Sequence, residues 1–383
     1  MTRRQFIRNF LITLNSMAMM SLMPKTLFAS ASADSDKSTS HYKPLNGRSL
    51  RGIAKDKMHH NSGGFVNPLG LGRDGRFWEV MKWKLFSNNQ FKEFFDEEQV
   101  LPVSIDWEPV RQHRGCSVTF VKHASVMIKD EDRYILVDPV FSDIFWFIKD
   151  FSPLEFDLQT MPAPQHVLIT HGHYDHLDKP SLGALKKDTH VITPLGYKQI
   201  FRDLNMNNQT QLDWFNSYGD GHRKITFLPC NHWTMRNPIT GPNRSLWGSY
   251  VIRTSGGYTI YLSGDTAYFD GFEQLGKEFD IDLAVFNVGA YEPRWFMAPS
   301  HMNPRETVQA FKELNARKLM VVHWGTFRLG DEPVHFPPIQ VKEELEKEGL
   351  LDRLVDLEHG DARSARLRAE EARRTAGVLG RPT

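Results

Sequence analysis

Cysteine is scarce in this chain of 383 residues, which contains only Cys116 and Cys230. Two thiols cannot form the disulfide framework that holds many small secreted domains together, and their positions leave open whether they pair. The chain also lacks an excess of either charge, with 47 basic and 46 acidic residues. We therefore expect no nucleic-acid partner, because such partners require a basic surface.

The apolar stretch near the N-terminus, residues 10–23, is short for a membrane span and contains Asn15 and Ser16. It follows the pair Arg3 and Arg4 and precedes the small residues ASASA at 29–33. This order resembles a twin-arginine export signal, and a membrane anchor is the alternative. We expect a signal peptide in residues 1–33 and a periplasmic location.

Composition divides the remaining chain into three parts. Residues 34–60 are rich in Ser, Lys, Asp and His without apolar periodicity, which predicts a flexible leader. Strand-like runs alternate with helical patterns between residues 110 and 360, which predicts one mixed α/β domain over 61–362 with an N-terminal extension. The charged, apolar-poor residues 363–383 predict a frayed or disordered tail.

Several elements can be placed within the domain. The run SYVIRTSGGYTIYLSGD predicts a hairpin that turns at Gly256-Gly257. Helical patterns occupy residues 76–86, 179–187 and 303–316, and Pro304 suits the first turn of the last of these.

The stretch LITHGHYDHLD at 168–178 carries the strongest functional signal. An apolar run that predicts a buried strand ends at His171, and Gly172 allows a tight turn there. His173 then projects to the same side of an extended loop, followed by Asp175 and His176. Imidazoles and carboxylates are metal ligands, and four of them in one short loop are too many for one ion. The loop therefore predicts two neighbouring metal ions, whereas a polar loop without metal is the alternative.

The pattern His-x-His-x-Asp-His after an apolar strand resembles the signature of the metallo-β-lactamase superfamily. The further ligands of that family have counterparts in His232 of LPCNHW, Asp265 of YLSGDT and His323 of LMVVHWGT, each after a strand-like run. The resemblance covers roughly residues 115–330 and implies a hydrolase with an αββα sandwich, in which two mixed sheets are flanked by helices. It implies that one zinc ion is held by His171, His173 and His232, the other by Asp175, His176 and His323, with Asp265 bridging them.

Histidine at position 173, where no acidic residue stands, favours Zn²⁺ over iron. Paired zinc ions lower the pKa of a shared water to about 7, so hydroxide is available at neutral pH. The predicted chemistry is hydrolysis of a phosphodiester, ester or lactam, with Asp175, Asp265 and His301 as catalytic residues.

Longer strings narrow the resemblance to one branch. DPVFSD at 138–143, NVGAYEPRWFM at 287–297, FVNP at 65–68 and HMNPRETVQAF at 301–311 are similar to stretches of the N-acylphosphatidylethanolamine-hydrolysing phospholipases D. One departure is VKHAS at 121–125, where glycine is expected in place of Lys122. The branch implies a phospholipase D that acts on N-acylphosphatidylethanolamine-type phospholipids. A lactonase or other ester hydrolase, or a low-turnover metal-binding envelope protein, is the alternative.

Five further residues have candidate roles. Tyr291 and Arg294 are expected to bind substrate, Arg294 through a phosphate oxygen, but Arg294 can equally pair with Glu292 or another carboxylate. His301 is expected to donate a proton to the leaving group, or else to support a ligand. A structural role is expected for His123, and a catalytic role is the alternative. Asp178 is expected to fix the loop or a ligand histidine without binding metal.

Two aromatic stretches, IFWFI at 144–148 and RFWEVMKWKLF at 76–86, suit a lipid-facing patch or an acyl-chain groove, since aromatic rings beside Lys and Arg favour a membrane interface. Packing of the N-terminal extension onto the core is the alternative. A phospholipid substrate and peripheral membrane contact are therefore the expected partners.

Overall fold

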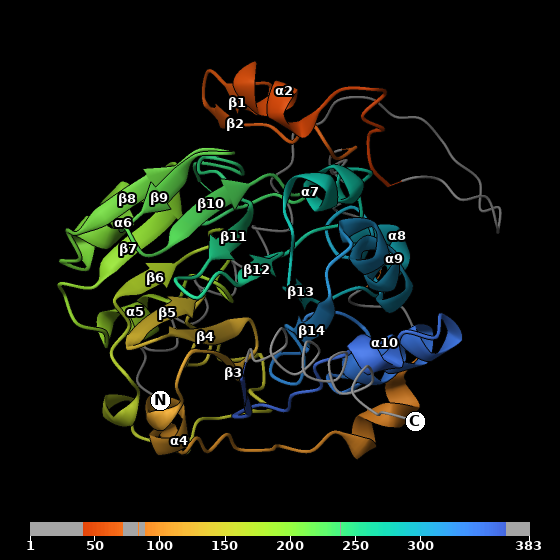
Figure 1. The fold of residues 1–383 in the computed structure, drawn as a ribbon. Coiled ribbons are helices and arrows are strands. Elements are labelled where there is room, and N and C mark those ends of the chain that lie inside the picture. The colour runs from red at the N-terminus through yellow and green to blue at the C-terminus, as the bar shows by residue number, and fades with distance from the viewer. Residues whose placement is uncertain (1–40, 72–82, 84–88, 238, 365–383) are drawn as a thin grey trace, which may run out of the picture.

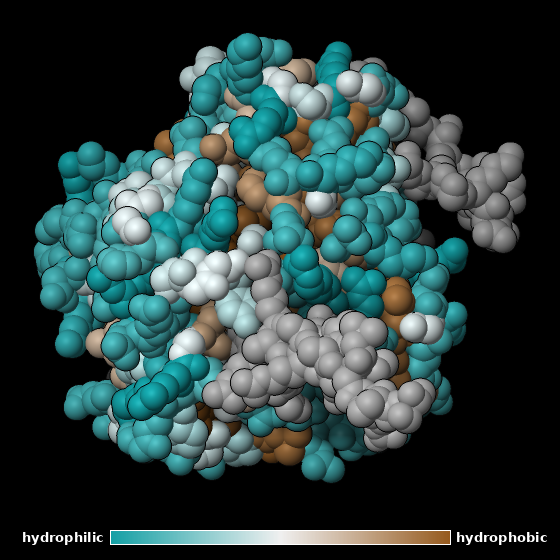
Figure 2. All heavy atoms as spheres, in the orientation of Figure 1, coloured by the Kyte–Doolittle hydropathy of each residue, from teal (hydrophilic) through white to brown (hydrophobic). Residues whose placement is uncertain are grey.

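The computed structural model describes residues 41–71, 83, 89–237 and 239–364 (Figure 1). The expected signal peptide, most of the helix expected at 76–86 and the tail beyond Ser364 lie outside these residues. Within the described part of the chain, no helix combines the length and the apolar character that crossing a bilayer requires. Hydrophilic residues cover most of the face shown in Figure 2.

Two mixed β-sheets form the centre of the fold (Figure 1). The seven-stranded sheet has the order β15 (Ala362–Ser364), β3 (Cys116–Lys122), β4 (Ser125–Asp130), β5 (Arg133–Val137), β6 (His166–Leu168), β7 (His190–Pro194), β8 (Gln209–Leu212). The six-stranded sheet has the order β14 (Lys318–Val322), β13 (Leu283–Asn287), β12 (Thr259–Leu262), β11 (Ser249–Arg253), β10 (Lys224–Leu228), β9 (Ser217–Gly219). A separate short hairpin pairs β1 (His60–Asn61) with β2 (Gly64–Phe65).

Alternation along the strands explains why both faces of the first sheet are covered. In β4, Val126 and Ile128 belong to the main core cluster, which also contains residues of the second sheet, whereas Met127 between them belongs to a second cluster. Successive side chains of a strand point to opposite faces, so one face meets the other sheet and the other face meets helices.

Helices cover the outer faces of both sheets, as expected for the αββα sandwich. The first sheet is covered by α4 (Trp107–Gln112), α5 (Lys179–Gly183) and α6 (Lys198–Asp203), which contribute apolar residues to the second cluster. The second sheet is covered by α7 (Phe272–Glu278), α9 (Pro304–Leu314) and α10 (Phe336–Lys347). The remaining helical segments are α2 (Leu50–Lys55), α8 (Arg294–Met297), η1 (Lys92–Glu97), η2 (Leu158–Thr160) and η3 (Leu351–Arg353).

The expected elements have clear counterparts. The predicted hairpin is β11–β12, and its two antiparallel strands are joined by a turn in which Gly257 has a φ of +82°. Helix α9 begins with Pro304, and a capping box between Asn303 and Glu306 closes its first turn, which explains its sharp start. Helix α5 is shorter than the predicted 179–187 and ends at Gly183.

The flexible leader expected at 34–60 is wrong for residues 41–60, which are packed onto the domain. Helix α2 buries Leu50, Ile53 and Ala54. Just beyond α2, His59 and His60 contact the carboxylate of Asp213. Nε2 of His59 lies 2.6 Å from it and Nε2 of His60 lies 2.9 Å from it. These contacts join residues far apart in sequence, so the local composition of the segment does not reveal them.

The carboxylate of Asp213 attaches this N-terminal segment to the domain. Burial opposes ionisation of Asp213, but hydrogen bonds from His59 and Lys57 lower its pKa well below the usual value of 3.8. A carboxyl group whose pKa is lower in the folded state stabilises the fold above its unfolded pKa, and this contribution is lost as the pH falls below that value.

We expect Asp213→Asn to lower the free energy of unfolding by about 1–3 kcal/mol at pH 7, because a buried, charge-assisted hydrogen-bond acceptor is lost. The difference from the unmodified chain should shrink below about pH 4. Urea unfolding at pH 7 and again below about pH 4 measures this difference in the free energy of unfolding. Asp352→Asn, at an exposed position, is the control, and equal effects of the two substitutions would contradict the assigned role.

Candidate metal centre

The strand directions bring the functional side chains to one edge of the sandwich. In the second sheet β10, β12 and β14 run in the same direction, and their carboxyl ends lead to His232, Asp265 and His323. In the first sheet β6 runs in the same direction as β5 and leads to His171. Residues separated by up to 152 positions therefore meet in one place, as the expected strand-end loops require.

The first cluster consists of His171, His173, His232 and Asp265, whose ligand atoms all lie within 4.8 Å of one another. Nδ1 of His173 lies 2.9 Å from Nε2 of His171 and 3.3 Å from Nε2 of His232. Oδ2 of Asp265 lies 3.8 Å from Nε2 of both His171 and His232. Ligand atoms on a tetrahedral zinc ion are about 3.3 Å apart, so these separations suit a single small cation.

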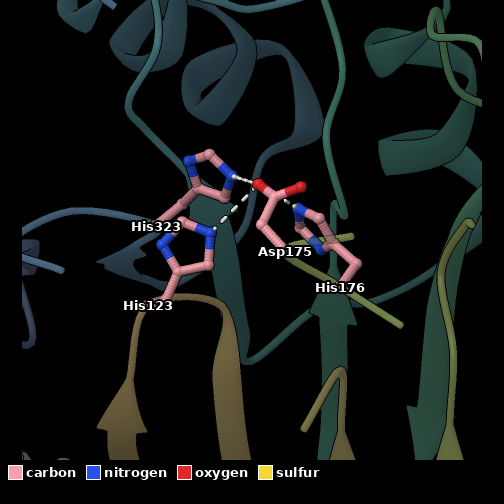
Figure 3. Close-up of side chains that lie close together, drawn as sticks. All are labelled: His123, Asp175, His176 and His323. Atoms are coloured by element: carbon pink, nitrogen blue, oxygen red, sulfur yellow. Dashed lines mark hydrogen bonds and ion pairs between the residues drawn. The ribbon is translucent and has the colours of Figure 1, made fainter. Parts of the chain in front are cut away.

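The second cluster consists of His123, Asp175, His176 and His323 (Figure 3). Oδ2 of Asp175 lies 3.3 Å from Nε2 of His323 and 3.5 Å from Nε2 of His176. His123, which sequence reasoning treated as structural, also reaches this carboxylate, at 3.2 Å.

Asp265 connects the two clusters. Besides its approach to the first cluster, its Oδ2 lies 3.2 Å from Nε2 of His176 and its Oδ1 lies 3.3 Å from Nε2 of His323. Its side chain is nearly inaccessible to solvent, and Nδ2 of Asn287 donates a hydrogen bond of 2.9 Å to Oδ1. This position between the clusters is the one that a bridging carboxylate requires.

Buried acceptors orient the histidines from behind. Oδ2 of Asp138 accepts Nδ1–H of His176 at 2.8 Å and the hydroxyl of Thr170 at 2.6 Å. Thr170 Oγ1 in turn lies 3.0 Å from Nδ1 of His171. In the same way, Nδ1 of His232 lies 2.9 Å from the carbonyl oxygen of Ser300.

An imidazole that binds metal through one nitrogen donates the other N–H to such an acceptor. These residues therefore fit a metal centre. Sequence reasoning missed Asp138, although Asp138 follows directly after the apolar run of β5, at the same kind of strand end as the expected ligands.

The charges in the two clusters also favour cations. Burial lowers the pKa of His171 and His232 well below the usual value, which leaves both rings neutral and able to bind metal. Burial would lower the pKa of His176 as well, but the carboxylates of Asp265 and Asp175 raise it well above its usual value. A positive charge is thus stabilised between the two carboxylates, at the place where a metal ion would bind.

His301, expected to be catalytic, lies at the open side of the first cluster. Its Nδ1 is 4.0 Å from Oδ2 of Asp265, and its side chain keeps 15% of its surface exposed, compared with 0% for His232. A ring at the solvent boundary of the centre can exchange protons with a substrate. Its catalytic role stays a prediction.

Arg294 and Tyr291, expected to bind substrate, support the scaffold in this structure. Nη2 of Arg294 lies 2.7 Å from Oε2 of Glu306, and its Nη1 donates to the carbonyl oxygen of His301 at 3.0 Å. The hydroxyl of the buried Tyr291 donates to Oε1 of Gln340 at 2.7 Å. The geometry fits the alternative of a carboxylate partner for Arg294, with Glu306 in place of Glu292, and substrate contact stays a prediction for both residues.

The remaining residues named from the sequence have structural roles. Asp178 lies outside both clusters and caps α5 by accepting the Ser181 amide at 3.0 Å. Lys122, where glycine was expected, is fully buried and paired with Asp150. Cys116 and Cys230 are buried free thiols, which answers the question of their pairing.

Aromatic and basic side chains contact Tyr174 in the loop that carries the predicted ligands. Tyr174 lies within the loop that carries the ligands, and its ring centroid is 5.1 Å from that of Phe145. The guanidinium of Arg236 lies 4.0 Å from the Tyr174 centroid. Trp146 and Phe147 in the expected lipid-facing stretch are 65% and 47% exposed. Arg236 was not singled out from the sequence, because nothing local marks it.

Comparison with known proteins agrees with this geometry. Residues 133–324 match the beta-lactamase superfamily domain. The chain is 30% identical over 271 residues to N-acyl-phosphatidylethanolamine-hydrolyzing phospholipase D 1 of Caenorhabditis elegans, which covers 65% of this chain and 75% of that protein.

The chain is also 34% identical over 226 residues to the mitochondrial N-acyl-phosphatidylethanolamine-hydrolyzing phospholipase D of Saccharomyces cerevisiae. This match covers 55% of this chain and 47% of the yeast protein, or about half of that relative. Among solved structures, an isothiocyanate hydrolase from Delia radicum gut bacteria superimposes with a TM-score of 0.54 at 19% identity, over 65% of this chain and 98% of that protein, which shows a shared fold. Sequence match, sandwich and ligand geometry together show that the chain belongs to the metallo-β-lactamase superfamily, in the branch of the N-acyl-phosphatidylethanolamine-hydrolysing phospholipases D.

Proposed function

We propose that this metal-dependent hydrolase is a phospholipase D that cleaves N-acylphosphatidylethanolamine-type phospholipids with two zinc ions. The observation that carries the proposal is the convergence of two histidine–aspartate clusters on Asp265, in a chain 30% identical to such a phospholipase D. Three imidazoles in the first cluster make its donor set suitable for zinc.

The side chains have distinct tasks in this proposal. His171, His173 and His232 hold one ion, Asp175, His176 and His323 hold the other, and Asp265 contributes to both. When bound, the two ions would supply Lewis acidity and would lower the pKa of a water molecule, which makes hydroxide available for hydrolysis. In this proposal, water becomes bonded to phosphorus, the bond between phosphorus and the head-group oxygen breaks, and His301 gives a proton to that oxygen as it leaves.

The aromatic stretch at 144–148 supports a lipid substrate. Trp146 and Phe147 expose large apolar surfaces, and Phe145 connects them to Tyr174 in the ligand loop. Large exposed aromatic residues are costly in water and favour a membrane interface. A lipid held by this stretch would have its phosphate group near the metal centre.

The substrate class is tested by comparing hydrolysis of N-acylphosphatidylethanolamine, phosphatidylcholine, a generic phosphodiester, a lactone and a β-lactam by the zinc-loaded chain. We expect the highest kcat/KM for the N-acylated phospholipid, with release of the N-acylethanolamine and phosphatidic acid. A preference for the lactone would favour the ester-hydrolase alternative. Absence of turnover on every compound would favour the envelope-protein alternative.

Trp146→Ala and Phe147→Ala should each weaken binding to phospholipid vesicles about tenfold, because each removes an aromatic ring that would enter the lipid interface. Vesicle co-sedimentation measures this binding, and turnover of a water-soluble phosphodiester should stay unchanged. Ile339→Ala is the matched control, because Ile339 and Phe147 are both 47% exposed and Ile339 lies on α10. Equal losses for Phe147→Ala and Ile339→Ala would contradict a specific lipid contact.

We also propose that residues 1–33 act as a twin-arginine signal, so that the chain reaches the periplasm and meets the membrane from that side. N-terminal sequencing of the chain from a periplasmic fraction tests this. A chain found in the cytoplasm with residues 1–33 still attached would contradict it.

A further inference from the structure

A third histidine, His123, lies beside Asp175, His176 and His323, the three predicted ligands of the second ion (Figure 3). We propose that His123 is a positioning residue, whose Nε2–H donates a hydrogen bond to Asp175 and holds that carboxylate in place for the second metal ion. This inference rests on the proposed two-ion centre and is independent of the proposed phospholipid substrate.

The contacts of Asp175 show what His123 does. Nε2 of His123 lies 3.2 Å from Oδ2 of Asp175, which is closer than Nε2 of His323 at 3.3 Å or of His176 at 3.5 Å. Asp175 is the partly exposed member of the cluster, with 13% of its side chain accessible, and it comes from a loop. A carboxylate in that position needs a fixed partner to keep one orientation, and the ring of His123 is fully buried.

The backbone at His123 is held in a conformation that non-glycine residues rarely adopt. His123 has a φ of +49°, and the register of β3 and β4 shifts between Phe120 and Lys122 just before it. Irregularities of this kind next to active sites redirect a side chain. Two contacts keep the turn in place, because the His123 amide donates to Thr326 Oγ1 at 3.0 Å and its carbonyl accepts the His323 amide at 2.7 Å.

The turn of His123 is therefore tied directly to the predicted ligand His323. The ring centroids of the two residues are 4.1 Å apart. A purely structural histidine would need none of these contacts to the centre.

The predicted ligands already give the second ion four protein donors, two imidazoles and two carboxylates. His176 and His323 each lie 3.2–3.5 Å from Asp175 and from Asp265, close to the separation of about 3.3 Å on a tetrahedral ion. A fifth protein ligand would take the position that a metal-bound water needs in the proposed reaction. A carboxylate oxygen has more than one lone-pair site, so Oδ2 of Asp175 can bind the ion and still accept a hydrogen bond.

The second nitrogen of the ring agrees with a donor role at Nε2. Nδ1 of His123 is buried and has no hydrogen-bond partner among the described residues. If Nε2 bound metal, Nδ1 would carry a proton without an acceptor, whereas His171, His176 and His232 have acceptors at that position. Nδ1 of His323 also lacks such a partner among the described residues, so the four donors already present weigh more against His123 as a ligand than its Nδ1 does.

The experiment compares His123→Gln and His123→Met, two side chains of similar length of which only glutamine can donate a hydrogen bond. Zinc affinity of each of the two sites is measured by competition with a chelator. We expect His123→Met to weaken one of the two sites about 10–100-fold and to leave the other within about threefold, as loss of a partner to a ligating carboxylate does. His123→Gln should recover most of the lost affinity.

X-ray absorption of the zinc-loaded chains provides a second measurement, and it does not depend on any substrate. The average number of imidazole ligands per zinc should be the same in His123→Met as in the unmodified chain. One imidazole fewer at the second ion would overturn the positioning role and make His123 a ligand. Equal weakening of both sites, or no weakening of either, would also overturn it.

His359→Met is the control for general loss of stability. His359 is a partly buried histidine whose Nε2 lies 3.0 Å from the carbonyl oxygen of Trp324, outside both clusters. Its substitution should leave both zinc affinities unchanged, and a loss equal to that of His123→Met would overturn the inference. An unmodified chain that binds fewer than two zinc ions would instead show that the two-ion centre itself is wrong, before any variant is compared.

Discussion

The structure depends on one electrostatic constraint, the burial of Asp265 among imidazoles from two clusters. A buried carboxylate is costly unless it is paired with positive charge or donors. Here the neighbouring His176 and His323 lower the pKa of Asp265 well below its usual value against the effect of burial, and Asn287 adds a hydrogen bond. Cations on both sides of this carboxylate would offset its charge further, so the fold suits a metal centre at this position.

The sandwich meets this constraint through strand direction. Because β10, β12 and β14 run in the same direction, loops that are distant in sequence reach the same edge, and β6 brings the histidine-rich loop to it from the other sheet. A second layer of buried acceptors then fixes the rings. Asp138 illustrates this layer, because it contacts His176 directly and reaches His171 through Thr170.

Much of this centre could be predicted from the sequence, because metal ligands follow apolar strands and leave a local pattern. His171, His173, Asp175 and His176 lie within six positions, and the later ligands each end a strand-like run. The αββα sandwich followed from the same resemblance. Asp213 and the packing of residues 41–60 could not be predicted, because the partners of His59 and His60 lie about 150 positions away and the segment itself is polar.

His123 and Arg294 show why the role of a single residue is harder to predict. His123 is one histidine in a strand-like stretch, and its contact with Asp175 arises only from an irregular turn with a positive φ. Arg294 lies in a string typical of the branch, but its guanidinium reaches Glu306 and the carbonyl oxygen of His301. A sequence motif identifies a residue, but it does not show which side chain that residue contacts in the folded chain.

The most direct test of the central claim is the number of zinc ions bound by the chain, measured by titration after treatment with a chelator. We expect two per chain, and we expect Asp265→Asn to weaken both sites, because this carboxylate lies between the clusters. A chain that binds no zinc, or an Asp265→Asn chain that keeps both affinities, would contradict it.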